Sequence, residues 1–275
     1  MGNAKDIILR PISSTEANAL VRRVHYSGKV VNNSQFHIGV FYHGKLEGAM
    51  QFGPSLDKRK MLGLVEGTGW NEFIELNRMA FSDALPRNSE SRAIGIAFRI
   101  LKKHAPHIKW AVSFADAAQC GDGTIYRASG FVLTAIKENN SLWAMPDGGA
   151  TISRTTVTKG SHIIADIALR RETTPQGGMN LTASGGGGSN MRAYVAAGYK
   201  PIPGFQLRYI YFLDPTARQR LTVPILPFSD IEKRGAGMYK GKSRAASIDS
   251  DAAGFQPEEG GADPTAALKL IDTSY

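Results

Sequence analysis

Two side chains that suit chemistry on an amino group stand at the ends of predicted secondary structure. Asp116 directly follows an apolar strand predicted over 110–115, and Tyr126 lies in a short helix predicted over 124–128. A carboxylate can accept a hydrogen bond from an amino group or bind a metal, and a tyrosine can stack on a ring or donate its hydroxyl. The alternatives are structural, because Asp116 can cap the loop 117–123 and Tyr126 can be a core residue.

A second pair of polar residues, Glu75 and Arg78, occurs within one strand predicted over 73–81. A carboxylate that is removed from water gains the raised pKa that a general base needs, so Glu75 is a candidate base. Arg78 can hold an anion or a phosphate, or it can form a buried ion pair with Glu75. Ser91, near the start of the next predicted helix, can orient a substrate or simply occupy the first helical turn.

The elements that position these residues begin with a helix. Ser13 and Glu16 form a capping-box pattern, and the apolar residues that follow recur at helical spacing. Two short strands, 37–42 and 46–52, come next and are joined by a His-Gly-Lys turn that is typical of a hairpin. The sequence therefore predicts a helix followed by a hairpin before the strand that carries Glu75.

A second helix begins within 88–91 and cannot continue beyond Pro106. Gly130 stands where the short helix over 124–128 needs a left-handed residue at its end, and a strand over 131–137 follows. Strands that alternate with helices in this way predict a mixed α/β layer fold with helices packed on the sheet.

We expect one catalytic domain over 1–228. Within it, 172–190 reads as a flexible loop, and its glycine run 185–188 is typical of a linker, whether natural or engineered. Residues 229–275 are basic at first and then rich in Gly, Pro and acids, which predicts a mostly disordered tail. Further strands are predicted over 151–157, 161–165 and 207–213.

Basic residues outnumber acidic ones, giving a formal net charge of +9. The excess is uneven, with 32 basic against 18 acidic residues in 1–244 and one against six in 245–275. A basic body suits a polyanionic partner such as nucleic acid, although a basic protein without any nucleic-acid role is the alternative. Candidate phosphate contacts are Arg22, Arg23, Lys58, Arg59, Lys60, Lys233, Arg234, Lys240, Lys242 and Arg244.

The composition also excludes several classes of protein. No apolar run approaches the roughly 20 residues of a membrane-spanning helix. The N-terminal segment MGNAKDIILRPISS lacks the apolar core of a secretory signal. Cys120 is the single cysteine, which excludes an intramolecular disulfide and a cysteine-rich zinc site. We therefore expect a cytosolic protein without a membrane anchor.

The order of elements from 72 to 137 resembles the core of the GNAT acyltransferases. A strand with a central acid, Glu75, is followed by an Arg-containing loop and a helix, then by a strand and a short helix that ends in IYRASGF. The resemblance implies a mixed, mostly antiparallel central sheet flanked by helices. In that family, backbone N–H groups of the loop before the helix hold the pyrophosphate of coenzyme A, as a helix N-terminus favours.

The corresponding loop, 87–93, departs from the family pattern. Its position makes Arg87, Ser89 and Arg92 the cofactor-binding candidates, but Glu90 and Arg92 stand where the family has small residues, mostly glycine. Side chains there hinder the close approach of backbone to phosphate, and Glu90 repels the phosphate charge. This departure argues against acetyl-CoA as the cofactor and leaves the fold resemblance intact.

A closer resemblance, to the phage Mom proteins, covers most of residues 20–240. Those are divergent GNAT-fold enzymes that convert adenine in phage DNA to N6-(carbamoylmethyl)adenine, which protects the DNA from restriction. The resemblance implies a transferase that acts on adenine N6 of double-stranded DNA, in the bacterial host cytoplasm of a phage or prophage. It rests on five segments in order: HYSGK (25–29), ELNRM (75–79), SFAD (113–116), GTIYRASGF (123–131) and GYKPIPGF (198–205).

The Mom resemblance also suggests an iron-dependent reaction, and His25, Tyr26 and Asp116 have side chains that iron accepts as ligands. In the alternative, His25 caps its helix and Tyr26 packs against the core. An enzyme that acts on adenine N6 in a duplex normally extrudes the base. Asp116 would then polarise the amino group while Tyr126 holds the ring.

Two other functions remain open. One is a conventional acetyl-CoA-dependent GNAT N-acetyltransferase acting on a small molecule or a protein, which needs an intact pyrophosphate loop. The other is a non-catalytic DNA-binding protein on the same scaffold. The small-molecule group donor, the DNA sequence context and the oligomeric state, including a homodimer, are not determined by the sequence.

Overall fold

The first helix forms where the capping-box pattern predicts it. The computed structural model describes residues 2–117, 121–138, 142–144, 151–153, 198, 200–201, 204–239 and 242–243. The Ser13 side chain accepts a hydrogen bond from the Glu16 backbone, and the Glu16 carboxylate accepts one from the Ser13 backbone at 2.8 Å. Helix α1 (Ser14–Val24) then buries Leu20 and Val21 against the sheet.

A seven-stranded sheet forms the centre of the protein, with strand order β1-β2-β3-β4-β5-β10-β6. Every neighbouring pair is antiparallel except β4 and β5, which are parallel. The mixed, mostly antiparallel sheet predicted from the sequence is therefore confirmed. The strands are β1 (Ile8–Pro11), β2 (Phe36–Tyr42), β3 (Lys45–Gly53), β4 (Phe73–Phe81), β5 (Trp110–Asp116), β6 (Val132–Glu138) and β10 (Phe205–Phe212).

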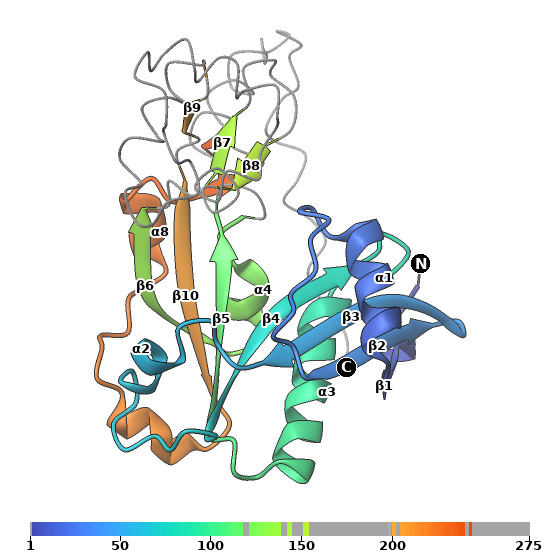
Figure 1. Cartoon of the computed structure of the whole chain (residues 1–275), viewed down its shortest axis with the longest axis horizontal. Coiled ribbons are helices and arrows are strands. Elements are labelled where there is room, and N and C mark those ends of the chain that lie inside the picture. The colour runs from blue at the N-terminus through green and yellow to red at the C-terminus, as the bar shows by residue number, and fades with distance from the viewer. Residues whose placement is uncertain are drawn as a thin grey trace, which may run out of the picture.

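The parallel pair opens along its length. Strands β4 and β5 pair only from Phe73 to Glu75 and from Trp110 to Val112. Beyond these residues the two strands diverge, as the V between them in Figure 1 shows. The divergence leaves the second half of β4 and the end of β5 available to line a cavity.

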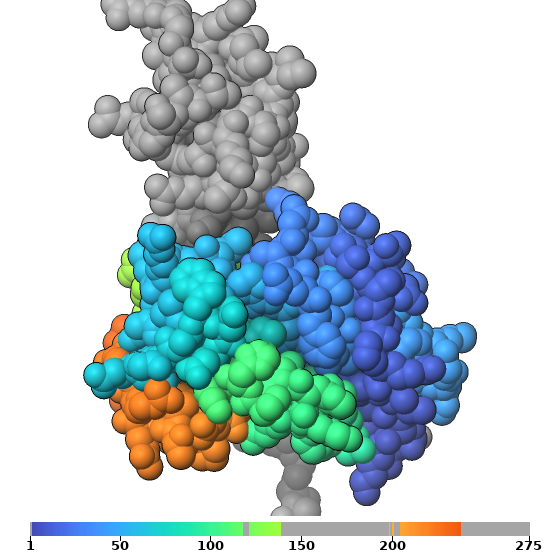
Figure 2. Space-filling view, turned by 60° about the horizontal axis from the view of Figure 1, so that its bottom comes forward, coloured from blue at the N-terminus to red at the C-terminus, as the bar shows by residue number. Residues whose placement is uncertain are grey.

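The face of the sheet that carries α1 also carries the segment between β3 and β4, which includes α2 (Lys58–Leu62). Val65 of this segment and Ile210 of β10 are fully buried in one cluster, in which the rings of Phe73 and Trp110 stack with centroids 4.5 Å apart. In Figure 2 the same segment, in light blue to cyan, forms a raised surface between the blue N-terminal part and the orange residues that follow β10.

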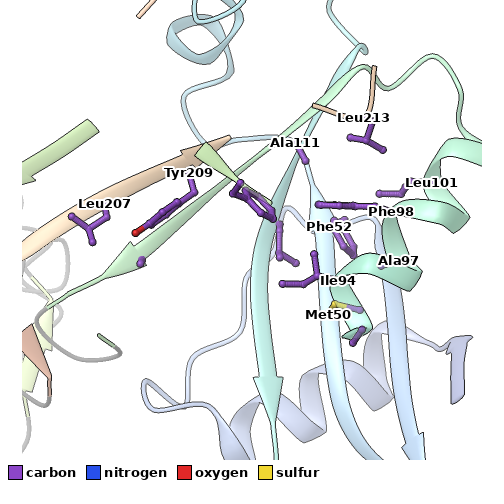
Figure 3. Packing of buried hydrophobic residues seen from close by; sticks show 14 of the residues in the cluster. Met50, Phe52, Ile94, Ala97, Phe98, Leu101, Ala111, Leu207, Tyr209 and Leu213 are labelled. Carbon is purple, nitrogen blue, oxygen red and sulfur yellow. The ribbon is translucent and has the colours of Figure 1, made fainter. Parts of the chain in front are cut away.

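Helix α3 (Ser89–His104) covers the opposite face (Figure 1). It ends just before Pro106, as predicted, and its apolar side packs into the main core (Figure 3). The Phe98 ring lies 4.3 Å from that of Tyr211 and 5.6 Å from that of Phe131, measured between centroids. Truncating such an aromatic residue to alanine costs about 3–5 kcal/mol, so α3 is firmly anchored to the sheet.

The short helix α4 (Thr124–Ala128) is bounded by two left-handed glycines. Gly123 has φ of 75° before the helix and Gly130 has φ of 84° after it, as the sequence predicts for Gly130. At Gly123 a Cβ would also lie 2.5 Å from the Tyr209 ring. Glycine is therefore required at position 123 by both backbone angle and space.

The packed unit extends past residue 228, where a mostly disordered tail was expected to begin. Helix α8 (Ser229–Lys233) buries Ile231, and Ala236 is fully buried after it. The strand predicted over 207–213 is confirmed as β10, and that over 151–157 is present as Thr151–Ser153, with the rest outside the described residues. The remaining elements are η1 (Ala4–Asp6), β7 (Leu142–Ala144), β8 (Thr151–Ser153), β9 (Lys200–Pro201), η2 (Pro215–Arg220), β11 (Met238–Tyr239) and β12 (Lys242–Ser243).

Several predictions fall on residues that the structure does not describe. These are the strand over 161–165, the loop over 172–190 with its glycine run, residues 244–275 and Cys120. Within the described residues, no helix combines the length and the apolar character that crossing a membrane requires.

Candidate active site

A cavity of about 310 Å³ lies where β4 and β5 diverge. Its lining comes from the end of α1, the second half of β4, the end of β5 and the first residues of α4. Four of the candidates from the sequence meet here: His25, Tyr26, Arg78 and Tyr126. The fold thus brings together residues that are 100 positions apart in the chain.

His25 is the residue at which α1 ends, and both of its ring nitrogens have neighbours. Nδ1 lies 2.9 Å from the Ser27 hydroxyl and 3.1 Å from the Ser27 backbone nitrogen, while Nε2 lies 3.4 Å from Nη1 of Arg78. Burial, and secondarily the charge of Arg78, lowers the pKa of His25 to about 4. The imidazole is therefore neutral at neutral pH.

Tyr26 stands at the open side of the cavity. Its ring centroid is 4.2 Å from that of His25, and half of the side chain, 50%, is exposed. Tyr26 therefore packs against His25 and also leaves part of its surface open, so the two interpretations of Tyr26 are compatible. An exposed aromatic ring beside a neutral imidazole offers a flat surface that a planar ligand can contact.

Tyr126 is held from two sides. Its hydroxyl lies 2.9 Å from Oγ of Ser113, and that Oγ lies 3.1 Å from the carbonyl oxygen of Leu76. The Tyr126 ring contacts Tyr209 and Phe131 at centroid distances of 5.1 and 5.2 Å. Core packing and a place in the cavity lining therefore occur together, so the two interpretations of Tyr126 are compatible.

Arg78 carries a positive charge into the cavity wall. Its Nε is buried and has no hydrogen-bond acceptor among the described residues. The ion pair between Arg78 and Glu75 that the sequence left open is not formed within the described chain. Arg78 also lines the cavity, so its guanidinium can donate to a ligand oxygen there.

Glu75 and Asp116 do not line the cavity. Burial raises the pKa of Glu75, partly offset by hydrogen bonds with Ser55 and Asn77 and by Arg78. Asp116 is half-buried at the end of β5, where its backbone pairs with Gln206 of β10. Both carboxylates therefore lie near the site but outside its lining.

Two further residues of the site were not predicted. Ser113 is buried on β5 and joins Tyr126 to the Leu76 backbone. Asp122 lines the cavity, and its Oδ1 accepts hydrogen bonds from the backbone and hydroxyl of Thr124 at 3.1 and 2.6 Å. The Asp-Gly-Thr run before a helix is a turn signal that could have identified Asp122. Ser113 belongs to the SFAD segment, but its residue type alone did not mark it as part of a site.

A second cavity of about 340 Å³ lies at the N-terminus of α3, where the GNAT pattern predicts the pyrophosphate. Arg87 and Ser91 line it together with the acids Asp83 and Glu90. Ser91 donates to the Asn88 carbonyl at 3.2 Å within the first turn. Two carboxyl groups at this opening oppose a diphosphate, so the residues present do not fit coenzyme A.

The other two cofactor-binding candidates, Ser89 and Arg92, do not line this second cavity. Ser89 is fully buried, with an Oγ that has no partner among the described residues, and Arg92 is exposed. Thr124 and Ile125 line both cavities, so the two openings meet at the start of α4.

The surroundings of His25 also bear on the iron expectation. The guanidinium of Arg78 stands at Nε2, and Ser27 occupies Nδ1. A cation bound to this imidazole would face the positive charge of Arg78 at close range. No cluster of three or more His, Cys, Asp or Glu side chains that could hold a metal occurs within the described residues. His25 and Tyr26 line the cavity, whereas Asp116, the third suggested ligand, does not, and the iron site stays a prediction.

All residues that line the cavity lie in the part of the chain that matches a known protein family. The Mom protein family matches residues 6–230. The methylcarbamoylase Mom of Escherichia phage Mu is 34% identical over 223 residues, which cover 81% of this chain and 82% of that protein.

Solved structures similar to the chain include two acetyltransferases. One is a Bacillus subtilis acetyltransferase in complex with CoA, at TM-score 0.37 and 11% identity, covering 75% of this chain and 97% of the other. The second is a GNAT family acetyltransferase from Elizabethkingia anophelis with acetyl-CoA bound, at TM-score 0.34 and 16% identity. The match covers 49% of this chain and 81% of the other.

Proposed function

The chain belongs to the Mom protein family, and from this premise we propose that it is a phage DNA modification enzyme. Its reaction would convert adenine in double-stranded DNA to N6-(carbamoylmethyl)adenine and so protect phage DNA from host restriction. The relative from phage Mu is named a methylcarbamoylase, which supports transfer of a small group that contains a carbamoyl unit. The setting would be the cytoplasm of a bacterium that carries the phage or prophage.

The observation that carries the proposal is the cavity between β4 and β5. At about 310 Å³ it lies at the lower end of the roughly 300–1,000 Å³ typical of small-ligand pockets. An extruded adenine is a ligand of this class, since enzymes that act on a base in a duplex first remove it from the stack. Tyr26 and Tyr126 supply aromatic rings for contact with it.

The reaction joins adenine N6 to the methylene carbon of a carbamoylmethyl donor. The N6–C bond forms as the bond between that carbon and its leaving group breaks, and N6 loses one proton. Because the N6 lone pair is delocalised, the amino group needs polarisation. The N6 proton passes to the leaving group or to water, because both ring nitrogens of neutral His25 are already engaged by Ser27 and Arg78.

Arg78 suits the other reactant. The amide carbonyl of the carbamoylmethyl group is an acceptor, and the guanidinium of Arg78 is a donor in the cavity lining. Binding there would place the donor beside His25, which is 3.4 Å from the same guanidinium. Arg78 would thus orient the donor while Tyr126 and Tyr26 hold the base.

Mass spectrometry of host DNA tests the proposal. The chain is expressed in bacteria, the DNA is digested to nucleosides, and deoxyadenosine carrying a carbamoylmethyl group is sought. We expect the modified nucleoside with the wild-type chain and a loss of at least tenfold with Arg78→Lys, because a lysine lacks the planar fork of donors that a guanidinium presents. Folded wild-type protein with only ordinary nucleosides would contradict the proposal.

The conventional acetyltransferase is the second candidate, and the second cavity opposes it. Asp83 and Glu90 line the opening where the diphosphate of acetyl-CoA would lie. Titration calorimetry with acetyl-CoA distinguishes the two functions, since tight binding together with acetylation of a small amine would favour this candidate.

A further inference from the structure

Large apolar side chains are exposed at few places in the described chain, and one of them lines the cavity. Leu56 is 91% exposed and Trp70 is 55% exposed, both in the segment between β3 and β4. Tyr26, 50% exposed, lies in the cavity lining itself. A single exposed leucine is ordinary on a protein surface, so its neighbours decide whether Leu56 has a function.

The backbone before Leu56 is fixed to the wall of the cavity. The carbonyl of Pro54 accepts hydrogen bonds from the side-chain amides of Asn33, at 2.5 Å, and of Asn77, at 3.4 Å. Asn77 itself lines the cavity, and Ser55 is buried. Leu56 therefore projects into solvent from a fixed turn whose anchor is a cavity residue.

Cations accompany the exposed apolar groups. Nζ of Lys58 lies 4.5 Å from the centroid of the Trp70 ring, and Arg59 beside it is exposed. Lys60 is paired with Asp57 at 2.6 Å, whereas Lys58 and Arg59 have no carboxylate within ion-pair distance in the described part of the chain. Exposed apolar side chains next to unpaired cations suit binding to DNA, because DNA presents both negatively charged phosphates and stacked bases.

We propose that Leu56 enters the DNA duplex and occupies the space left by the extruded adenine. The inference rests on the proposed function, because it presupposes that an adenine leaves the stack and enters the neighbouring cavity. Apolar wedges inserted between base steps are a general means of unstacking DNA. Lys58 and Arg59 contact phosphates beside the opened step, in keeping with the basic character of residues 1–244.

Fluorescence of 2-aminopurine tests the wedge without any group donor. The modified sites found in host DNA define the target sequence, and a duplex is made with 2-aminopurine at the target adenine. Wild-type protein should raise the fluorescence several-fold as the base unstacks. Leu56→Ala should lose most of this rise while its affinity for the duplex stays within about threefold. Leu56→Met, which keeps an apolar side chain of similar size, should retain it.

A matched control and a rescue make the result specific. Ile225→Ala removes an exposed side chain of similar size, 43% exposed, and should leave the fluorescence unchanged. A duplex in which the target lies opposite an abasic site is already partly opened and should restore the response of Leu56→Ala. In host DNA, Leu56→Ala should lower the modified deoxyadenosine at least tenfold.

The outcomes separate the two proposals. Wild-type protein that modifies DNA, with Leu56→Ala equally active and equally fluorescent, overturns the wedge and leaves the proposed function standing. Wild-type protein that yields no modified nucleoside overturns the proposed function first. A change of oligomeric state in Leu56→Ala, measured by light scattering, would assign Leu56 to contact with a second copy of the chain and would also overturn the wedge.

Discussion

The charge state of His25 depends on burial and on the nearby Arg78, and the local sequence shows neither of them. Burial and Arg78 lower the pKa of His25 from its ordinary value of 6.5 to about 4 in the folded protein. Between pH 6.5 and pH 4 the unfolded chain therefore binds a proton at His25 that the folded protein excludes. Folding loses stability as the pH falls through this window.

His25→Gln removes this titration. The free energy of unfolding should then decrease less steeply between pH 6.5 and pH 4 in the variant than in the wild type, as measured by urea denaturation at a series of pH values. Burial also lowers the pKa of His37, but that residue is present in both proteins and cancels in the comparison. Identical pH dependence in the two proteins would show that the folded imidazole takes up its proton normally.

The candidate site was predictable from the sequence only in part. Residue types and short segments identified His25, Tyr26, Arg78 and Tyr126, which all line the cavity. Glu75 and Asp116 were equally good candidates by type but lie outside the lining. The direction in which a strand side chain points depends on pairing with distant strands, which local sequence does not encode. Ser113 was missed for the same reason.

At the scale of elements, α4 positions Tyr126, and Gly123 determines where α4 begins. Gly123→Ala should lower the free energy of unfolding by about 2–3 kcal/mol, because alanine is strained at φ of 75° and its Cβ would lie 2.5 Å from the Tyr209 ring. Urea denaturation measures the loss. Gly130→Ala is the matched control: φ is 84°, but the nearest atom is 3.7 Å away, so only about 1 kcal/mol should be lost. Equal losses would mean that contact with Tyr209 is unimportant.

Elements with local signals were predicted best. The capping box predicted the start of α1, and Pro106 and Gly130 predicted the ends of two helices. Each of these signals acts on the backbone within a few residues of itself. The insertion of β10 between β5 and β6 could not be predicted in this way. It joins residues about 95 positions apart in β5 and β10, and only tertiary packing selects that pairing. The packing of α8 after residue 228 is likewise a tertiary effect.

The whole molecule presents a strongly basic body, with 32 basic against 18 acidic residues in 1–244, and this should make duplex binding depend steeply on salt. The individual cations should differ, because Lys60 is already paired with Asp57 and Arg59 is not paired within the described chain. Arg59→Ala should reduce the slope of log K against log salt by roughly 0.9, the value for one phosphate contact. Lys60→Ala should change this slope much less, because the Lys60 ammonium is already paired with a carboxylate and neutralises a phosphate less. Fluorescence anisotropy with labelled duplex at several salt concentrations measures both slopes, and equal slopes for the two variants would place the phosphate backbone away from α2.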